Sequence, residues 1–327
     1  MKSIPEYRPL LPHWVGGLVQ TIAANLCASG ALLPEAEVMH LLLPDGDSVA
    51  VLKNIPAFAT GKAVLVIHGL GASAHDPVVQ RATLHLLASG NIVYRMNHRG
   101  VAEGSGKAKG LYHAGRESDV ACVVETLSVR ESFDALAIVA YSLSGNMALH
   151  YLGKQASKLP PKLRGAVCLC PVIDIARASK AISHEHAGVL NRFFMKAVRE
   201  YLAEFPVQSQ VAKSYRALPS LRRLCDLEDL LVAPLGGYGT ALEYYRQASA
   251  LPYISRVTLP TYVVNTQDDP IAVTERTLSW SNPNISLLRP VTGGHLGFLA
   301  KGKNSLGTRF WIDELTQVLV ERLWGMA

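Results

Sequence analysis

No stretch of this 327-residue sequence approaches the roughly 18 consecutive apolar residues that a membrane-spanning helix needs. The first residues, MKSIPEYRPLLPHWVGG, place prolines where a signal peptide requires a continuous apolar segment. The five cysteines form no CxxC pair, and their odd number does not match a disulfide framework. Together these absences favour a reduced, cytoplasmic protein.

Charged residues are also sparse, at 18% of the chain, and none of them form a dense basic block. Lysine and arginine exceed aspartate and glutamate enough to give a net charge of +6. They are scattered, however, without the basic and aromatic interleaving of a nucleic-acid surface, so we expect no nucleic-acid partner. The basic balance is compatible with contact at a membrane surface and does not require it. The apolar fraction of 49% indicates a folded globular protein.

Short β-rich runs alternate with helix-like segments along the chain. The β-rich runs lie at 36–43, 48–53, 63–67, 91–96, 135–140, 165–170, 261–266 and 284–289. The helix-like segments lie at 76–89, 116–129, 145–157, 270–280 and 308–324. Several runs are continuously apolar, which is typical of parallel strands covered on both faces. This alternation predicts an α/β fold with a mostly parallel, eight-stranded sheet flanked by helices.

The alternation is interrupted once, by about ninety residues between Cys170 and Thr261 that contain no clear strand. Helical patterns such as GVLNRFFMKAVREYLAEF fill this interval. We therefore predict one domain over residues 1–327, with a helical cap inserted at about 175–255 over the carboxyl ends of the strands. The alternative is that these helices simply pack against the sheet.

One serine, Ser142 in AYSLSG, stands between a strand-like run and a helix-like run. This is the position of the nucleophile in the strand–turn–helix motif G-x-S-x-G. Here Ala140 and Ser144 replace the two outer glycines. A strained turn brings these positions close together, so the side chains there must be small. Alanine and serine are the smallest substitutes, and we expect the turn to form.

Ser142, Asp269 and His295 follow strand ends in the chain order Ser, Asp, His that α/β-hydrolases use. A serine hydroxyl must lose its proton to a base as it attacks, and a histidine held by a carboxylate is such a base. His295 lies in the glycine-flanked segment VTGGHLGF. In QDDP, Asp268 is an alternative acid, but we favour Asp269 because it directly precedes the turn at Pro270.

The segment LVIHGLGASAHDP, residues 65–77, runs from a strand into a loop of small residues. In hydrolases such a loop supplies one main-chain N–H of the oxyanion hole, and the residue after the nucleophile supplies the other. This assigns Leu70 and Leu143, both through their backbones. The loop contains neither GxxxxGK[ST] nor GxGxxG, so we expect no nucleotide cofactor. The triplet HEH at 184–186 lacks the HExxH spacing, and we expect no metal.

Several longer segments resemble the YheT-like branch of the α/β-hydrolase superfamily, the AB hydrolase 4 family. They are HGLGASAHDPVVQ, NHRGVAEGS, LYHAGRESDV, YSLSGNMALHYLG, APLGGYGTALEYYRQASALPYI, NTQDDP and GGHLGF. The segment GGLVQTI is similar to the family's H-L-Q-T-I, with Leu18 after Gly17 and no histidine there. The resemblance implies Ser142 as nucleophile, Asp269 as acid and His295 as base. The departure lies at Ala140 and Ser144, where the family has glycines.

From these residues we predict a serine hydrolase that cleaves carboxylic esters through an acyl-enzyme and needs no cofactor. The cap composition and the resemblance favour a small-molecule substrate with an acyl or other hydrophobic group. One alternative is an acyltransferase that uses the same triad and passes the acyl group to an alcohol. Another is a binding protein that keeps the pocket but has lost turnover. The oligomeric state does not follow from the sequence.

Overall fold

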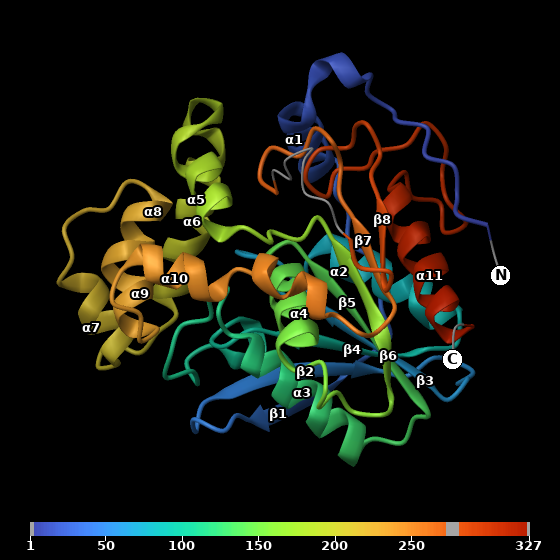
Figure 1. Ribbon diagram of the computed structural model, residues 1–327, viewed down its shortest axis with the longest axis horizontal. Coiled ribbons are helices and arrows are strands. Elements are labelled where there is room, and N and C mark those ends of the chain that lie inside the picture. The colour runs from blue at the N-terminus through green and yellow to red at the C-terminus, as the bar shows by residue number, and fades with distance from the viewer. Residues whose placement is uncertain (1–2, 273–280, 326–327) are drawn as a thin grey trace.

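In the computed structural model, which describes residues 3–272 and 281–325, one sheet of eight strands forms the centre of the protein (Figure 1). The strands are β1 (Glu37–Leu42), β2 (Ser48–Asn54), β3 (Lys62–Ile67), β4 (Ile92–Asn97), β5 (Ala135–Tyr141), β6 (Leu163–Leu169), β7 (Thr261–Val264) and β8 (Ile285–Leu288). Their order in the sheet is β1-β2-β4-β3-β5-β6-β7-β8. Strand β2 pairs antiparallel with β1 and β4, and all other pairs are parallel. The predicted mostly parallel, eight-stranded α/β sheet is confirmed.

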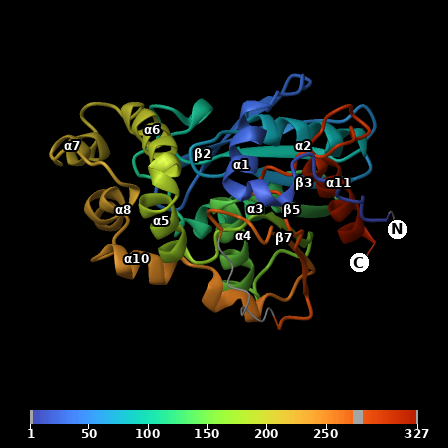
Figure 2. The ribbon, with the colours of Figure 1, turned by 90° about the horizontal axis from the view of Figure 1, so that it is seen from above.

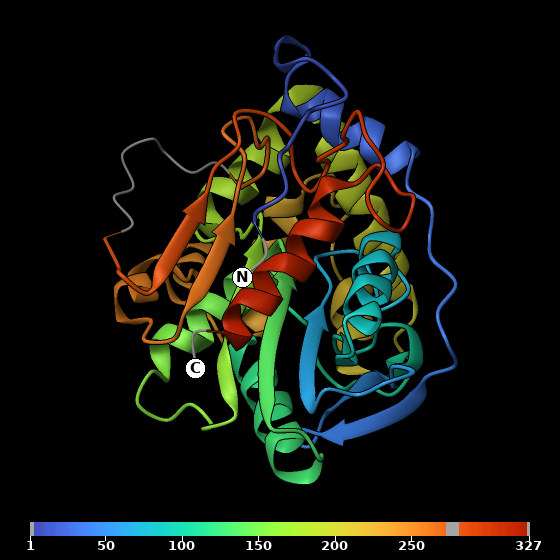
Figure 3. The same ribbon diagram turned by 90° about the vertical axis from the view of Figure 1, so that its right-hand side faces the viewer.

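Helices cover both faces of this sheet. They are α1 (Gly17–Leu26), α2 (Pro77–Ala88), α3 (Glu117–Arg130), α4 (Leu143–Lys154) and α11 (Trp311–Trp324). Figure 3 shows α2 and α11 lying across one face, and α3 and α4 pack on the other. Helix α2 begins where the sequence specifies it, because Asp76 caps the N–H of Val78 and Pro77 occupies the first turn.

Strand β5 has the two-sided burial that a continuous apolar run predicts. Ile138 and Ala140 belong to the apolar cluster shared with α3 and α4. Val139 and Tyr141 belong to the cluster shared with α2 and α11. The strand is therefore fixed on both faces, and it holds the following residue, Ser142, at the carboxyl edge of the sheet.

A group of helices follows β6 and ends before β7, over the interval predicted to form a cap. Figure 1 shows this group as a lobe beside the sheet. Its elements are α5 (Ile175–His184), α6 (Val189–Ala203), α7 (Gln210–Arg216), α8 (Leu224–Leu227), the π-helical segment η4 (Glu228–Val232), α9 (Ala233–Leu235) and α10 (Ala241–Ala248). The lobe has its own apolar cluster, which also includes Leu143 at the start of α4. It thus packs directly over the turn at Ser142.

Four short 3₁₀ helices complete the described secondary structure: η1 (His13–Val15), η2 (Ala102–Gly104), η3 (His186–Gly188) and η5 (Leu251–Arg256). Helix α1 was not anticipated from the sequence. The helix predicted at 270–280 falls mostly on residues 273–280, which lie outside the described residues. Within the described part of the chain, no helix is both long enough and apolar enough to cross a membrane.

Candidate active site

Ser142 occupies the sharp turn that joins strand β5 to helix α4. Its φ of 52° and ψ of −114° lie in a region that residues with side chains rarely adopt. The N–H of Ser142 donates to the carbonyl of Leu169 (2.8 Å), and the N–H of Asn146 donates to the carbonyl of Ser142 (3.2 Å). Strain of this kind costs about 1–3 kcal/mol and persists only where the surrounding structure imposes it. The backbone at Ser142 therefore has the form of a nucleophile elbow.

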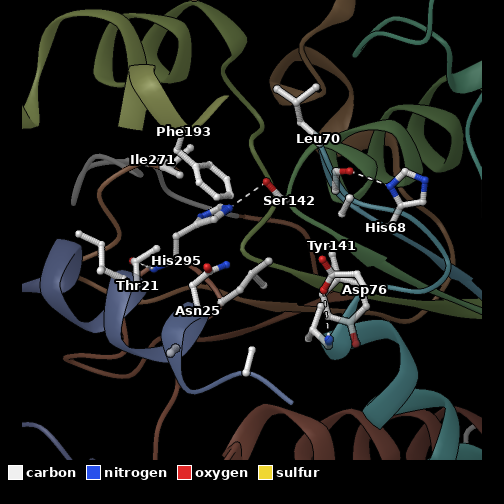
Figure 4. Close-up of a pocket in the computed structure, with 18 of the residues that line it drawn as sticks. Thr21, Asn25, His68, Leu70, Asp76, Tyr141, Ser142, Phe193, Ile271 and His295 are labelled. Carbon is white, nitrogen blue, oxygen red and sulfur yellow. Dashed lines mark hydrogen bonds between the residues drawn. The ribbon is translucent and has the colours of Figure 1, made fainter. Parts of the chain in front are cut away.

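Ser142, His295 and Asp269 form one line of hydrogen bonds. The hydroxyl of Ser142 lies 2.8 Å from Nε2 of His295 (Figure 4). On the other side of the ring, Nδ1 of His295 lies 3.0 and 2.9 Å from the two carboxylate oxygens of Asp269. All three side chains are buried. Because Nδ1 donates to the carboxylate, Nε2 is left to accept the serine proton.

The sequence left two neighbouring aspartates as alternative partners for His295, and the structure distinguishes between them. Asp269 contacts His295, and its Oδ1 also accepts the N–H groups of Ile271 and Ala272, each at 2.8 Å. These main-chain donors fix the carboxylate toward the imidazole ring. Asp268 makes different contacts, described next, so of the two candidates the structure brings only Asp269 to His295.

Asp268 holds the loop that carries His295. Its carboxylate accepts the hydroxyl of Thr292 (2.7 Å) and the N–H of Gly294 (2.9 Å). The side-chain amide of Gln20, on helix α1, donates to the same carboxylate (3.1 Å). Asp268 thus connects its own loop to helix α1 and to the loop that carries His295. These bonds help to position the imidazole ring.

Ser144, at the second glycine position of the elbow motif, uses its hydroxyl inside the protein. The hydroxyl donates to the carbonyl of His68 and lies 2.7 Å from Nε2 of His98. Burial lowers the pKa of His68 to about 4 and that of His98 well below its usual value. Both rings are therefore neutral near pH 7, and His98 donates its Nε2–H to Ser144. The hydroxyl joins the elbow to the loop that starts at His68.

The same loop is held at a second point by Tyr112. The Tyr112 hydroxyl accepts the N–H of Gly71 (3.1 Å). Its ring stacks on that of His98, with 4.9 Å between ring centroids. Leu70 lies between these two fixed points, the carbonyl of His68 and the N–H of Gly71. Its backbone is therefore positioned by contacts on both sides.

The loop also approaches the elbow closely, which places the two N–H groups predicted for the oxyanion hole near Ser142. A Cβ added to Gly69 would lie 3.2 Å from Cβ of Ser142, so a larger residue does not fit there without a shift. Among the described residues, the N–H groups of Leu70 and Leu143 have no hydrogen-bond acceptor. Both therefore remain available to donate to a substrate oxygen.

A cavity of about 410 Å³ opens over Ser142 and His295. Figure 4 shows helix α6 on one side of it and helix α1 on the other. Most of the side chains that line it are apolar, including Ile22, Leu26, Leu190, Phe193, Phe194 and Ile271. A cavity of this size and lining suits a ligand with a substantial apolar part.

Comparison with known proteins identifies the family. A family model described as the alpha/beta hydrolase fold matches residues 62–301. The chain belongs to this family. It is similar to YheT of Escherichia coli (strain K12), with 29% identity over 84% of this chain and 81% of YheT. It is also similar to the medium-chain fatty acid ethyl ester synthase/esterase 2 of Saccharomyces cerevisiae, with 26% identity over 75% of this chain. The aligned part covers 60% of that yeast protein.

Solved structures show the same fold. The crystal structure of the 2,6-dihydroxy-pseudo-oxynicotine hydrolase superimposes with a TM-score of 0.57. The two chains share 19% identity, and the match covers 93% of this chain and 72% of the other. At this identity the likeness supports the α/β-hydrolase fold alone.

Helix α1 is a part of this α/β-hydrolase site that the sequence did not predict. The N–H of His295 donates to the hydroxyl of Thr21 (2.8 Å). Gly17 lies so close to the main chain of Asp268 that an added Cβ would lie 1.7 Å from the carbonyl oxygen. The signal available in the sequence was the resemblance of GGLVQTI to a family segment, which does not say where that segment packs.

Cys170 is a second residue whose place in the site was missed. Residues two positions apart in a strand share a face, so the spacing of Cys168 and Cys170 predicts that both thiols lie on one side of the sheet; the structure contradicts this prediction. Strand β6 ends at Leu169, Cys170 has a φ of 47°, and the two thiols lie in clusters on opposite faces. The Cys170 thiol lies next to the Asp269 carboxylate and the His295 ring, with the three ligand-type atoms within 4.8 Å of one another, and burial raises the pKa of the thiol well above its usual value. The thiol therefore remains protonated beside the carboxylate.

Cys170, Asp269 and His295 also bring three atoms of ligand type within 4.8 Å of one another. The Asp269 and His295 atoms already bond to each other, and a metal-bound cysteine would have to lose its proton. The arrangement fits a chain of hydrogen bonds that orients the imidazole better than it fits a metal centre.

Proposed function

We propose that this protein is a serine hydrolase that cleaves carboxylic esters with an apolar acyl group. The observation that supports this most directly is the 2.8 Å contact between Ser142 and His295 at a strained elbow beneath an apolar cavity. In this proposal Ser142 is the nucleophile, His295 the base and Asp269 the group that orients it. The names of the relatives support the ester class, since the yeast protein is called an ethyl ester synthase/esterase.

The reaction begins when the hydroxyl oxygen of Ser142 attacks the ester carbonyl carbon and its proton passes to Nε2 of His295. The N–H groups of Leu70 and Leu143 donate to the carbonyl oxygen as it becomes negative, and one such donor is worth about 3 kcal/mol. His295 then gives the proton to the departing alcohol. Water, deprotonated by His295, attacks the acyl-enzyme and releases the acid and free Ser142. Asp269 keeps the imidazole in the tautomer that this sequence needs.

The cavity supports the proposed substrate class. Its wall carries aromatic and aliphatic side chains from α1 and α6 directly above Ser142, so an acyl chain can extend along it after the carbonyl is bound. The yeast relative's name specifies medium-chain fatty acid esters, which is the same chemical class. We therefore propose acyl esters of hydrophobic acids in preference to small polar esters.

The nucleophile is tested with a fluorophosphonate probe, which reacts with activated serines, followed by mapping of the modified peptide. We expect the adduct on Ser142, and we expect Ser142→Ala to remove both the adduct and the turnover of p-nitrophenyl esters. A short and a long acyl chain should be compared, with a higher kcat/KM for the longer one. A wild-type protein that is neither labelled nor active on any chain length would contradict a catalytic role and leave a binding protein.

The two aspartates provide a matched pair of variants. Asp269→Asn should lower kcat by a factor of about 1,000 or more, because an amide no longer holds the required imidazole tautomer. Asp268→Asn should lower it by about tenfold or less, since an amide still accepts from Gly294 and can bond to Thr292. Equal losses in the two variants, measured on the same ester, would contradict the assignment of Asp269.

Acyl transfer to an alcohol is the second candidate function. The yeast relative supports it, because its name includes both a synthase and an esterase activity. The two outcomes differ in the group that attacks the acyl-enzyme, which is water or an alcohol. Product analysis with added ethanol separates them: mostly free acid indicates a hydrolase, and mostly ethyl ester indicates a transferase.

A further inference from the structure

Residues 9–34 contain no aspartate, glutamate, lysine or arginine, although 18% of the chain is charged. This segment includes η1 and α1, and it lies on the surface. Trp14 is 77% exposed, Val19 48% and Leu26 81%. An uncharged surface segment that presents large apolar side chains to solvent is unusual in a protein that contacts only water.

The exposed apolar side chains are arranged around the mouth of the cavity. Ile22 and Leu26 on α1, and Phe193 on α6, both line the cavity and remain exposed. We call these three residues the mouth. Figure 1 shows α1 and the α5–α6 pair at the same end of the molecule, and Figure 2 shows them next to each other from that end. Trp14 and Val19 extend the apolar surface from the mouth along η1 and α1.

Two basic side chains flank Phe193 at the mouth. Arg192 and Lys196 lie one residue before and three residues after Phe193 on α6, and both are exposed. Lys196 forms a single long ion pair with Glu200, at 3.9 Å between exposed side chains. The other side of the mouth, α1, has no charged residue to oppose them. The whole chain has a net charge of +6.

We propose that this surface docks onto an anionic phospholipid bilayer, with Trp14, Val19 and the mouth inserted at the interface. Apolar side chains flanked by basic ones are what such a bilayer binds, because it offers acyl chains next to negative headgroups. A second copy of the chain fits less well, since pairing through the mouth would bring basic side chains together. Docking in this way brings the cavity entrance to the region where apolar esters dissolve. The proposed docking does not depend on Ser142 being a nucleophile.

Sedimentation with lipid vesicles tests the proposal on the full-length protein. The vesicles contain phosphatidylcholine alone, or phosphatidylcholine and phosphatidylglycerol at about three to one. We expect binding to the mixed vesicles and weaker binding to phosphatidylcholine alone. In the double variant Trp14→Ser/Val19→Gln, the partition coefficient should fall by about tenfold or more. Neither residue lines the cavity, so hydrolysis of a dissolved short-chain ester should be unchanged.

The matched control removes two exposed apolar side chains from other surfaces, Val129 on α3 and Leu242 on α10, which are 85% and 74% exposed. The variant Val129→Gln/Leu242→Gln should bind vesicles within about twofold of the wild type. Absence of wild-type binding, or equal binding by the two double variants, would overturn the proposal. So would a wild-type dimer that becomes a monomer only in the Trp14/Val19 variant, because this surface would then serve a second copy.

Discussion

At the residue scale, the two side chains that replace glycines at the elbow have different consequences. Ala140 is fully buried in an apolar cluster, so its methyl group adds packing without needing a polar partner. Ser144 brings a hydroxyl that bonds both to the carbonyl of His68 and to His98. The elbow is thereby connected to the loop that contains Leu70. This link uses the side chain that a glycine would lack.

Removing the Ser144 hydroxyl should impair the oxyanion hole more than substrate binding. We expect Ser144→Gly, which restores the family residue, to lower kcat by about three- to tenfold with little change in KM. The reason is that a buried carbonyl and a ring N–H lose a partner, at a cost of about 1–3 kcal/mol that the loop relieves by moving. Steady-state kinetics on one p-nitrophenyl ester measures both constants.

Ser144→Ala separates the hydroxyl from the size of the side chain. If the hydrogen bonds hold the loop, the alanine and glycine variants should show similar losses in kcat. An alanine variant with the wild-type kcat would mean that volume alone matters at this position.

The meeting of Ser142, Asp269 and His295, which we propose as the catalytic triad, could be expected from the sequence because motif, chain order and position after a strand all indicate these three residues. The supporting contacts could not. Thr21 and His295 are 274 positions apart, and only the folded chain shows that one bonds to the other. Cys170 was misassigned because a residue with φ of 47° breaks the alternation of side chains on which strand reasoning depends.

At the scale of elements, the helical lobe is organised around a buried acid. Glu228, in the π-helical segment η4, bonds to the hydroxyl of Ser179 on α5 and to that of Tyr245 on α10 (2.8 Å). These bonds connect three elements of the lobe. Burial raises the pKa of Glu228 to about 7, and the two hydroxyl donors offset only part of this effect.

The stability contributed by Glu228 should therefore depend on pH. Between its ordinary pKa of 4.5 and about 7, the folded protein holds a proton that the unfolded chain has lost. Stability consequently falls as pH rises through this window and levels off above it. Glutamine does not titrate, so the free energy of unfolding of the wild type relative to Glu228→Gln should fall by about 3 kcal/mol from about pH 4 to about pH 8. Urea unfolding of both proteins at several pH values measures it.

The difference in the free energy of unfolding between the wild type and Glu228→Gln isolates Glu228, because the other buried groups that titrate contribute equally to both proteins. His68 and His113, for example, have a lowered pKa and act in the opposite direction below pH 6.5. A difference that stays constant across the pH range would show that Glu228 is ionised in the folded protein.

The strands could be predicted because several are continuous apolar runs, a pattern that can be recognised without knowing the tertiary structure. The absence of strands between β6 and β7 led us to expect a helical insertion there, and the helices α5 to α10 lie in that interval. Helix α1 was not predicted, because its sequence GLVQTIAANL has exposed apolar residues as well as buried polar Gln20, so it lacks a clean amphipathic period. Its position is set by the loops it packs against.

At the scale of the whole molecule, the site is complete only when the two ends of the chain meet. Helix α1 comes from the first tenth of the sequence, and the loops that carry Asp268 and His295 come from the last fifth. Gln20 and Thr21 bond to these loops, and α1 also forms one wall of the cavity. Loosening α1 should therefore disturb the histidine, the cavity and the proposed membrane surface together.

Gly17 offers a way to loosen α1 with a single methyl group. An added Cβ would lie 1.7 Å from the backbone oxygen of Asp268, so Gly17→Ala must push the helix and the loop apart. We expect kcat/KM to fall by about tenfold or more, since a small displacement of a catalytic group has an effect of this size. Limited proteolysis should also cut earlier within residues 9–34. The matched control is Gly302→Ala, where the added Cβ meets nothing within 4 Å. If Gly17→Ala behaves like this control in both measurements, α1 does not position the loops.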